Sequence, residues 1–69
     1  MMNRKVLVRG QGWQAAGIVV NEAPTSVLIA YQRGYEHVSA WFHNDPSFAR
    51  HGRRIGDGFD APPIFEVVS

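Results

Sequence analysis

The chain has 69 residues, a net charge of +1 and no cysteine. A chain of this length forms one domain at most, and so small a domain has a marginal core that usually needs a covalent staple, a metal or a partner subunit. The missing cysteines exclude disulfides and thiolate metal sites and favour a cytoplasmic setting. The near-neutral charge argues against binding nucleic acid by bulk electrostatics.

The beginning of the chain, MMNRKVLVRG, lacks the apolar stretch of a secretory signal peptide. No apolar run approaches the roughly 18 residues of a membrane-spanning helix. We therefore expect one cytoplasmic domain over residues 1–69, without a membrane partner.

Alternating apolar residues predict two strands near the N-terminus. Residues 5–9 place Val6 and Val8 on one face, and glycines 10 and 12 then mark a turn. A second strand is predicted over about 14–21, because GIVV is rich in β-branched residues and too short for a helix. Pro24 in the following NEAPTS segment predicts a loop.

The clearest strand is VLIAYQ, residues 27–32, in which Val27, Ile29 and Tyr31 share one face. The two residues RG at 33–34 predict a tight turn into a fourth, antiparallel strand. A helix over EHVSAWF is the alternative, but the hairpin spacing and the alternation favour a strand.

The fourth predicted strand has large side chains on both faces. One set is Glu36, Val38, Ala40 and Phe42; the other is Tyr35, His37, Ser39 and Trp41. We assign the first set to the core, with Glu36 at its rim, and the second set to an outward face that meets a partner.

Residues 43–63 are rich in glycine and proline and have little periodicity, which predicts a long loop. Within it, Asp45, Pro46 and Gly52 fit the N-cap, the first position and the stop of a helical turn. A closing strand is predicted over 64–68.

Five short strands of this kind predict an all-β fold, a five-stranded small barrel with a long loop before the last strand. Closure of such a sheet removes its exposed edges. The expected core is Val6, Val8, Ile18 or Val19, Val27, Ile29, Val38, Ala40, Phe42, Phe65 and Val67.

Residues 4–42 resemble the SH3-like small barrels, and the Tudor and KOW group in particular. The matching residues are Trp13, Gly17, Val19, Val27, Ile29, Tyr31 and Gly34. The resemblance implies an SH3-like barrel, and it places Trp13, Tyr31 and Tyr35 at positions that form an aromatic cage for a methylated cation in Tudor-like domains.

Trp41 lies on the same strand face as Tyr35 but about 20 Å along the strand, so the two form an aromatic stripe rather than one cage. Such a stripe stacks bases in some small barrels. The alternative is that Trp13 and Tyr31 belong to the core and that Trp41 lies under the loop or at a subunit interface.

A basic loop, RHGRR, contains Arg50, Arg53 and Arg54 between glycines. Arginine binds phosphates and carboxylates through paired hydrogen bonds. The alternative is a solvated loop whose charge is offset by Asp57 and Asp60.

No catalytic or metal motif is present in the sequence. His37, His43 and His51 lack the short spacing of zinc ligands, and no nucleophile elbow surrounds Ser39. Type II dihydrofolate reductases are also SH3-like barrels, but Leu28 stands where their VQIY segment has glutamine. We expect no enzyme, no metal and no cofactor.

The expected function is a non-catalytic protein-interaction or assembly module. Its predicted binding residues are Trp13, Tyr31, Tyr35, His37, Trp41, Arg50, Arg53 and Arg54. The expected partner is a protein or a second copy of the chain. The alternative is a small nucleic-acid-binding barrel, with the arginines on phosphates and the aromatic residues stacking on bases.

Overall fold

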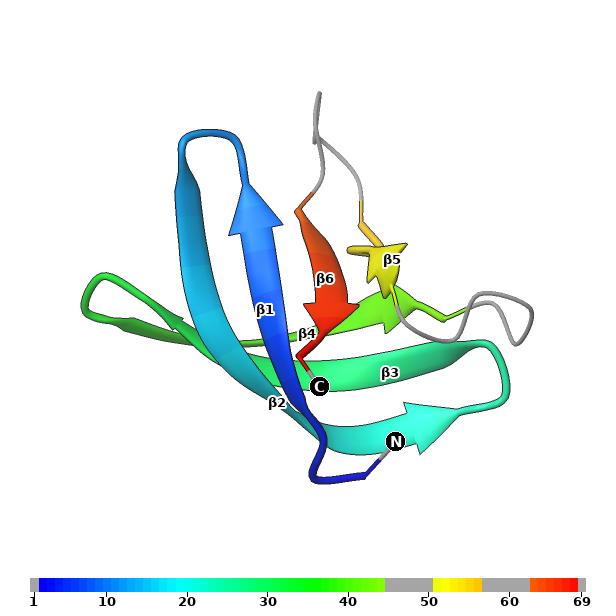
Figure 1. The fold of residues 1–69 in the computed structure, drawn as a ribbon. Helices are drawn as coiled ribbons and strands as arrows, with labels where there is room; N and C mark the ends of the chain where they lie inside the picture. Colours follow the sequence, from blue (N-terminus) through cyan, green and yellow to red (C-terminus); the bar gives the residue numbers. More distant parts are fainter. Residues whose placement is uncertain (1, 45–50, 57–62, 69) are drawn as a thin grey trace.

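The computed structural model describes residues 2–44, 51–56 and 63–68, and their regular structure is a single antiparallel sheet (Figure 1). Its strands are β1 (Lys5–Gly10), β2 (Trp13–Ala23), β3 (Ser26–Arg33), β4 (Glu36–His43), β5 (His51–Arg53) and β6 (Ile64–Val67). The strand order across the sheet is β4-β3-β2-β1-β6-β5. None of the described residues belongs to a helix that could cross a membrane.

The predicted all-β class is confirmed, and the five strands expected from the sequence are all present. The hairpin between β3 and β4 has a two-residue turn, but at residues 34–35 and not at the predicted 33–34, so Tyr35 lies in the turn and not on the fourth strand. Arg33 pairs with Glu36, and Gly34 takes the positive φ of 63° that the first turn residue needs.

The number of strands differs from the prediction. β5 lies inside the stretch 43–63 that was expected to be loop, and it pairs with β6 from Arg53↔Ile64 to His51↔Glu66. Gly52, the expected stop of a helical turn, lies within this strand, whereas Asp45 and Pro46 are outside the described residues. Three residues with a central glycine carry no alternation, so the pairing partner and not the local sequence creates the strand.

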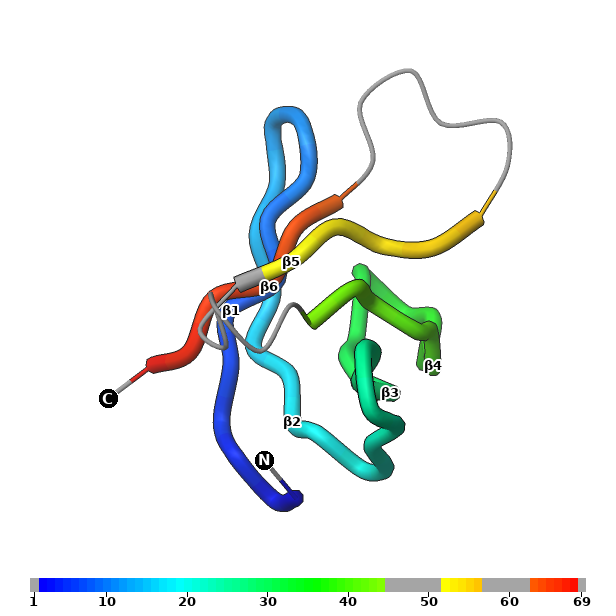
Figure 2. Tube along the Cα trace, turned by 90° about the vertical axis from the view of Figure 1, so that its right-hand side faces the viewer, coloured from blue at the N-terminus to red at the C-terminus, as the bar shows by residue number. Residues whose placement is uncertain are grey.

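The sheet curls because β2 serves two partners. Its first half pairs with β1, its second half pairs with β3, and a β-bulge lies between Val19 and Asn21. Figures 1 and 2 show the result, a half-barrel in which β3 and β4 cross beneath β1 and β6. Among the described residues the two ends of the curl meet at an isolated bridge between Phe42 and Arg54, beside which the backbone N–H of Ile55 donates to the carbonyl of Trp41 at 2.8 Å.

The core lies inside this curl and is built from the inward side chains of five strands. Phe42 packs edge-on against Phe65 at 5.7 Å between ring centroids, and against Tyr31 at 6.2 Å. The buried set is Val6, Val8, Val19, Val27, Ile29, Tyr31, Ala40, Phe42 and Phe65, with Val38 and Val67 packed against it. The predicted core is therefore confirmed, with Val19 rather than Ile18 as its member from β2.

Gly52 allows the closest approach in the barrel. A Cβ atom there would lie 1.5 Å from the carbonyl oxygen of His43, which is backbone and cannot turn aside. We expect Gly52→Ala to lower the free energy of unfolding by about 2–3 kcal/mol, as overpacking does, measured by chemical denaturation followed by circular dichroism.

Gly12→Ala is the matched control, because nothing lies within 4 Å of a Cβ there although φ is +78°. This variant should lower the free energy of unfolding only by the cost of a positive φ for alanine, about 1 kcal/mol. Equal losses for the two variants would contradict the close approach at Gly52.

Candidate binding surface

The two faces of β4 differ as the alternation predicts. Ala40 and Phe42 are buried and Val38 is half-buried, whereas Tyr35, His37, Ser39 and Trp41 are all exposed. Tyr35, in the turn, is fully exposed, and Trp41 keeps 37% of its surface accessible. The outward position of this aromatic stripe in the single chain is therefore established.

The outward face continues across three more strands. Lys5, Ile18, Ala30 and Ser39 are direct cross-strand neighbours and form one outward row over β1 to β4. The next row inward along the strands is Val6, Gly17, Tyr31 and Val38, whose side chains point to the core. On the outward side of the sheet this second row presents only its backbone, so it forms a trough beside the first row.

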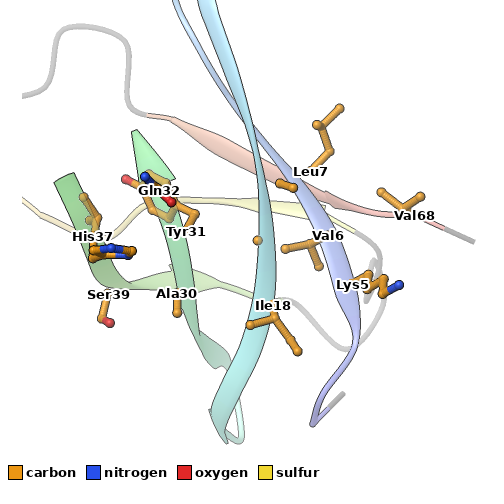
Figure 3. Close-up of a pocket in the computed structure, with 13 residues that line it drawn as sticks. Lys5, Val6, Leu7, Ile18, Ala30, Tyr31, Gln32, His37, Ser39 and Val68 are labelled. Carbon is orange, nitrogen blue, oxygen red and sulfur yellow. The ribbon is translucent and has the colours of Figure 1, made fainter. Parts of the chain in front are cut away.

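This trough is a groove of about 610 Å³, which we call the outer groove. Its lining includes the small residues Ala16, Gly17 and Ala30, and Figure 3 shows the side chains of Ile18, Ala30 and Ser39 pointing the same way from three strands. Its full lining is Lys5, Val6, Leu7, Ala16, Gly17, Ile18, Ala30, Tyr31, Gln32, His37, Val38, Ser39 and Val68. The lining is mostly apolar, with polar side chains at the margins.

Further apolar side chains lie beside the outer groove. Leu28 is the cross-strand neighbour of Trp41, and Val20, on the outward side of β2, is 40% exposed. An antiparallel sheet packed on one core normally turns polar side chains outward. Here both faces carry apolar residues, which is typical of a surface that meets another molecule.

Sequence reasoning placed the outward stripe on the fourth strand alone and missed the groove beside it. The signal was present, because two of the three outward residues of the predicted third strand, Leu28 and Ala30, are apolar. Leu7 and Ile18 repeat the pattern in the strands before it. What the sequence lacked was the register that aligns these residues across the sheet.

The residues predicted to form an aromatic cage are partly brought together. Trp13 and Tyr31 stack with 6.0 Å between their ring centroids and 17° between their planes, and Tyr31 is buried in the core. The guanidinium carbon of Arg33 lies 4.5 Å from the centre of the Trp13 ring. The cation of Arg33 therefore already contacts the π-face of Trp13. Tyr35 lies two residues after Arg33, in the hairpin turn.

Two arginines of the predicted basic loop, Arg53 and Arg54, have different surroundings. The side chain of Arg54 donates a hydrogen bond to the hydroxyl of Tyr31 at 3.1 Å, in a partly buried position. Arg53 is exposed in β5, and Arg50 lies outside the described residues. In the described part of the chain, then, Arg53 alone of these three points to solvent.

Within the described ranges no cluster of three or more histidine, cysteine, aspartate or glutamate side chains could hold a metal ion. Comparisons of the chain with protein-family models, with curated proteins and with solved structures gave no significant match. The chemistry of the surface is therefore inferred from the residues that form it.

The hydrogen bond between Arg54 and Tyr31 links the segment after β5 to the centre of the core. We expect Tyr31→Phe to lower the free energy of unfolding by about 1 kcal/mol, because it removes the acceptor and keeps the ring. In a double-mutant cycle with Arg54→Met, the two losses should be less than additive, since both remove the same bond. Strict additivity in denaturation experiments would contradict the contact.

Proposed function

We propose that the chain is a non-catalytic interaction module that binds apolar side chains of a protein partner in the outer groove. The observation that carries this proposal is the apolar outward face, with Ile18 and Trp41 each more than a third exposed. Removing apolar surface from water contributes about 25 cal/mol per Å². A partner that covers the groove would gain this contribution at the core of an interface.

The shape of the groove supports a protein ligand. Its floor of alanine and glycine lets a partner side chain come close to the backbone, and Leu7, Ile18 and Val68 stand around it. Polar groups, Lys5, His37 and Ser39, occur at its margin. An apolar centre with a polar rim is the usual anatomy of a protein interface.

A catalytic role for His37 and Ser39 has little support from this geometry. Both side chains line the outer groove. They are neighbours simply because they are two residues apart on the same face of one strand. Glu36, the acid next to His37, belongs to the opposite face of β4. A relay of serine, histidine and acid would need all three on one side.

Nucleic-acid binding is the second candidate, and Arg53 with the exposed ring of Tyr35 is the observation in its favour. Against it, Arg33 and Arg54 interact with aromatic side chains of their own chain. Phosphate binding releases counterions, so its affinity falls steeply with salt. Docking in an apolar groove should barely respond to salt.

The groove is tested by selecting peptides from a displayed random library against the protein and mapping the selected peptides by amide NMR. We expect apolar sequences that shift the resonances of Ile18, Ala30 and Ser39 and bind equally at low and moderate salt. Ile18→Lys should weaken this binding at least tenfold, because it places a charge over the groove floor.

Ile64→Lys is the matched control, since Ile64 is outward on β6 and 41% exposed against 38% for Ile18, but does not line the groove. It should bind the selected peptides as the unmodified chain does. The proposal would be refuted by equal losses in the two variants. It would also be refuted if short single-stranded oligonucleotides shifted Arg53 in a salt-dependent way while no peptide was selected.

A further inference from the structure

The width of the outer groove decides which kind of segment it accepts. Two outward rows of side chains bound it, one from Lys5 to Ser39 and the other from Leu7 to His37. The rows lie two residues apart along each strand, which is about 7 Å. An α-helix with its side chains is about 10–12 Å wide and does not fit between them. A single extended chain does fit, because neighbouring strands in a sheet lie only about 4.8 Å apart.

The length of the groove sets how many residues of such a segment it holds. The groove crosses from Lys5 on β1 to Ser39 on β4, over β2 and β3. Three spacings of about 4.8 Å between strands give about 14 Å, and an extended segment advances about 3.3 Å per residue. Four or five residues of a partner therefore cover the groove from end to end.

The two ends of the groove differ in charge. Figure 3 shows Lys5 at one end and His37 with Ser39 at the other. Lys5 is exposed and forms no ion pair with a described residue, whereas Arg9, on the same outward side, is paired with Glu66. None of the described residues that line the groove is acidic. The β1 end is therefore cationic, and the β4 end offers neutral hydrogen-bonding groups.

The middle of the groove is apolar. Leu7 and Ile18 stand beside the small residues Ala16 and Gly17, so a large side chain of a partner can come close to the backbone of β2. The side chain of Ile18 is 38% exposed and gains from being covered. An apolar residue is thus favoured in the middle of the bound segment, next to the cationic end.

We propose that the occupant of the outer groove is an extended segment of a partner protein with an acidic side chain on Lys5 and a large apolar side chain over Ala16 and Gly17. This inference rests on the proposed function and names the sequence that the groove selects. An exposed ion pair adds only about two- to fivefold to an affinity. The apolar middle supplies the rest, so binding still responds little to salt.

The inference is tested by selecting displayed peptides in parallel against the unmodified chain and against Lys5→Glu. The unmodified chain should select apolar peptides with aspartate or glutamate at one end, and Lys5→Glu should select lysine or arginine there. By titration calorimetry at low salt, an acidic peptide should bind Lys5→Glu at least fivefold more weakly. The same peptide with lysine in place of its acidic residue should recover that loss.

Arg4→Glu is the matched control, because Arg4 is exposed and adjacent to Lys5 in the chain but does not line the groove. It changes the net charge by the same amount and should bind the acidic peptide within twofold of the unmodified chain. Equal losses in Arg4→Glu and Lys5→Glu would show an effect of overall charge and overturn the inference. Circular dichroism of each variant establishes that the sheet is folded.

The orientation of the segment is measured with a spin label on the peptide. A label beside the acidic residue should broaden the amide resonance of Lys5 more than that of Ser39, and a label at the other end should do the reverse. A reversed pattern would overturn the placement of the acidic side chain. So would a selected peptide that becomes helical when bound, since the groove is too narrow for a helix.

The outcomes separate this inference from the proposed function. Peptides that show no preference for acidic residues but lose binding in Ile18→Lys would overturn the acidic segment and leave the groove as the binding site. If no peptide is selected, or if binding survives Ile18→Lys, both proposals fail.

Discussion

The close approach of β2 and β3 at Gly17, the residue that pairs with both Val6 of β1 and Tyr31 of β3, is the constraint on which the rest of this structure depends. A Cβ atom at this position would lie 3.0 Å from a methyl group of Ile29 and 3.1 Å from the carbonyl oxygen of Ala30. The missing side chain lets β3 come close while β2 turns from one half of the sheet to the other. The same row of residues then serves two surfaces, because Val6 and Tyr31 point into the core while their backbone forms the floor of the outer groove. Core and groove are two sides of one layer of chain.

The double use of one layer of chain, for the core and for the outer groove, explains why so short a chain has apolar residues on both faces. A curled sheet can enclose a single layer of side chains, here centred on Phe42 and Phe65, and a small domain buries a smaller fraction of its surface than a large one. The closure of the curl is also short, since Phe42 pairs with Arg54 in an isolated bridge. A half-barrel with a second apolar face gains further stability when that face is covered, which is what the proposed partner would do.

The sequence predicted the parts of this fold that are local. Period-two alternation located the strands, and Gly34 placed the β3–β4 turn to within one residue. The sequence alone could not decide whether Ile18 or Val19 belongs to the core. Both are apolar, and a one-residue change in register exchanges the two faces of a strand. β5 was missed because it forms only by pairing with β6, a separate segment of the chain. The hydrogen bond of Arg54 to Tyr31 was missed because it also joins residues that are far apart in the sequence. The outer groove depends on four strands in register, which no single stretch of sequence records.

The exposed side of β4 combines two kinds of recognition in the same residues. The side chains of His37 and Ser39 line the outer groove, while their backbone N–H and C=O groups point away from β3. Backbone pairing supplies affinity with little regard to sequence, and side chains on alternate positions supply specificity. In the proposed binding mode the specificity would therefore come from the outward row of Ile18, Ala30 and Ser39, which three neighbouring strands align.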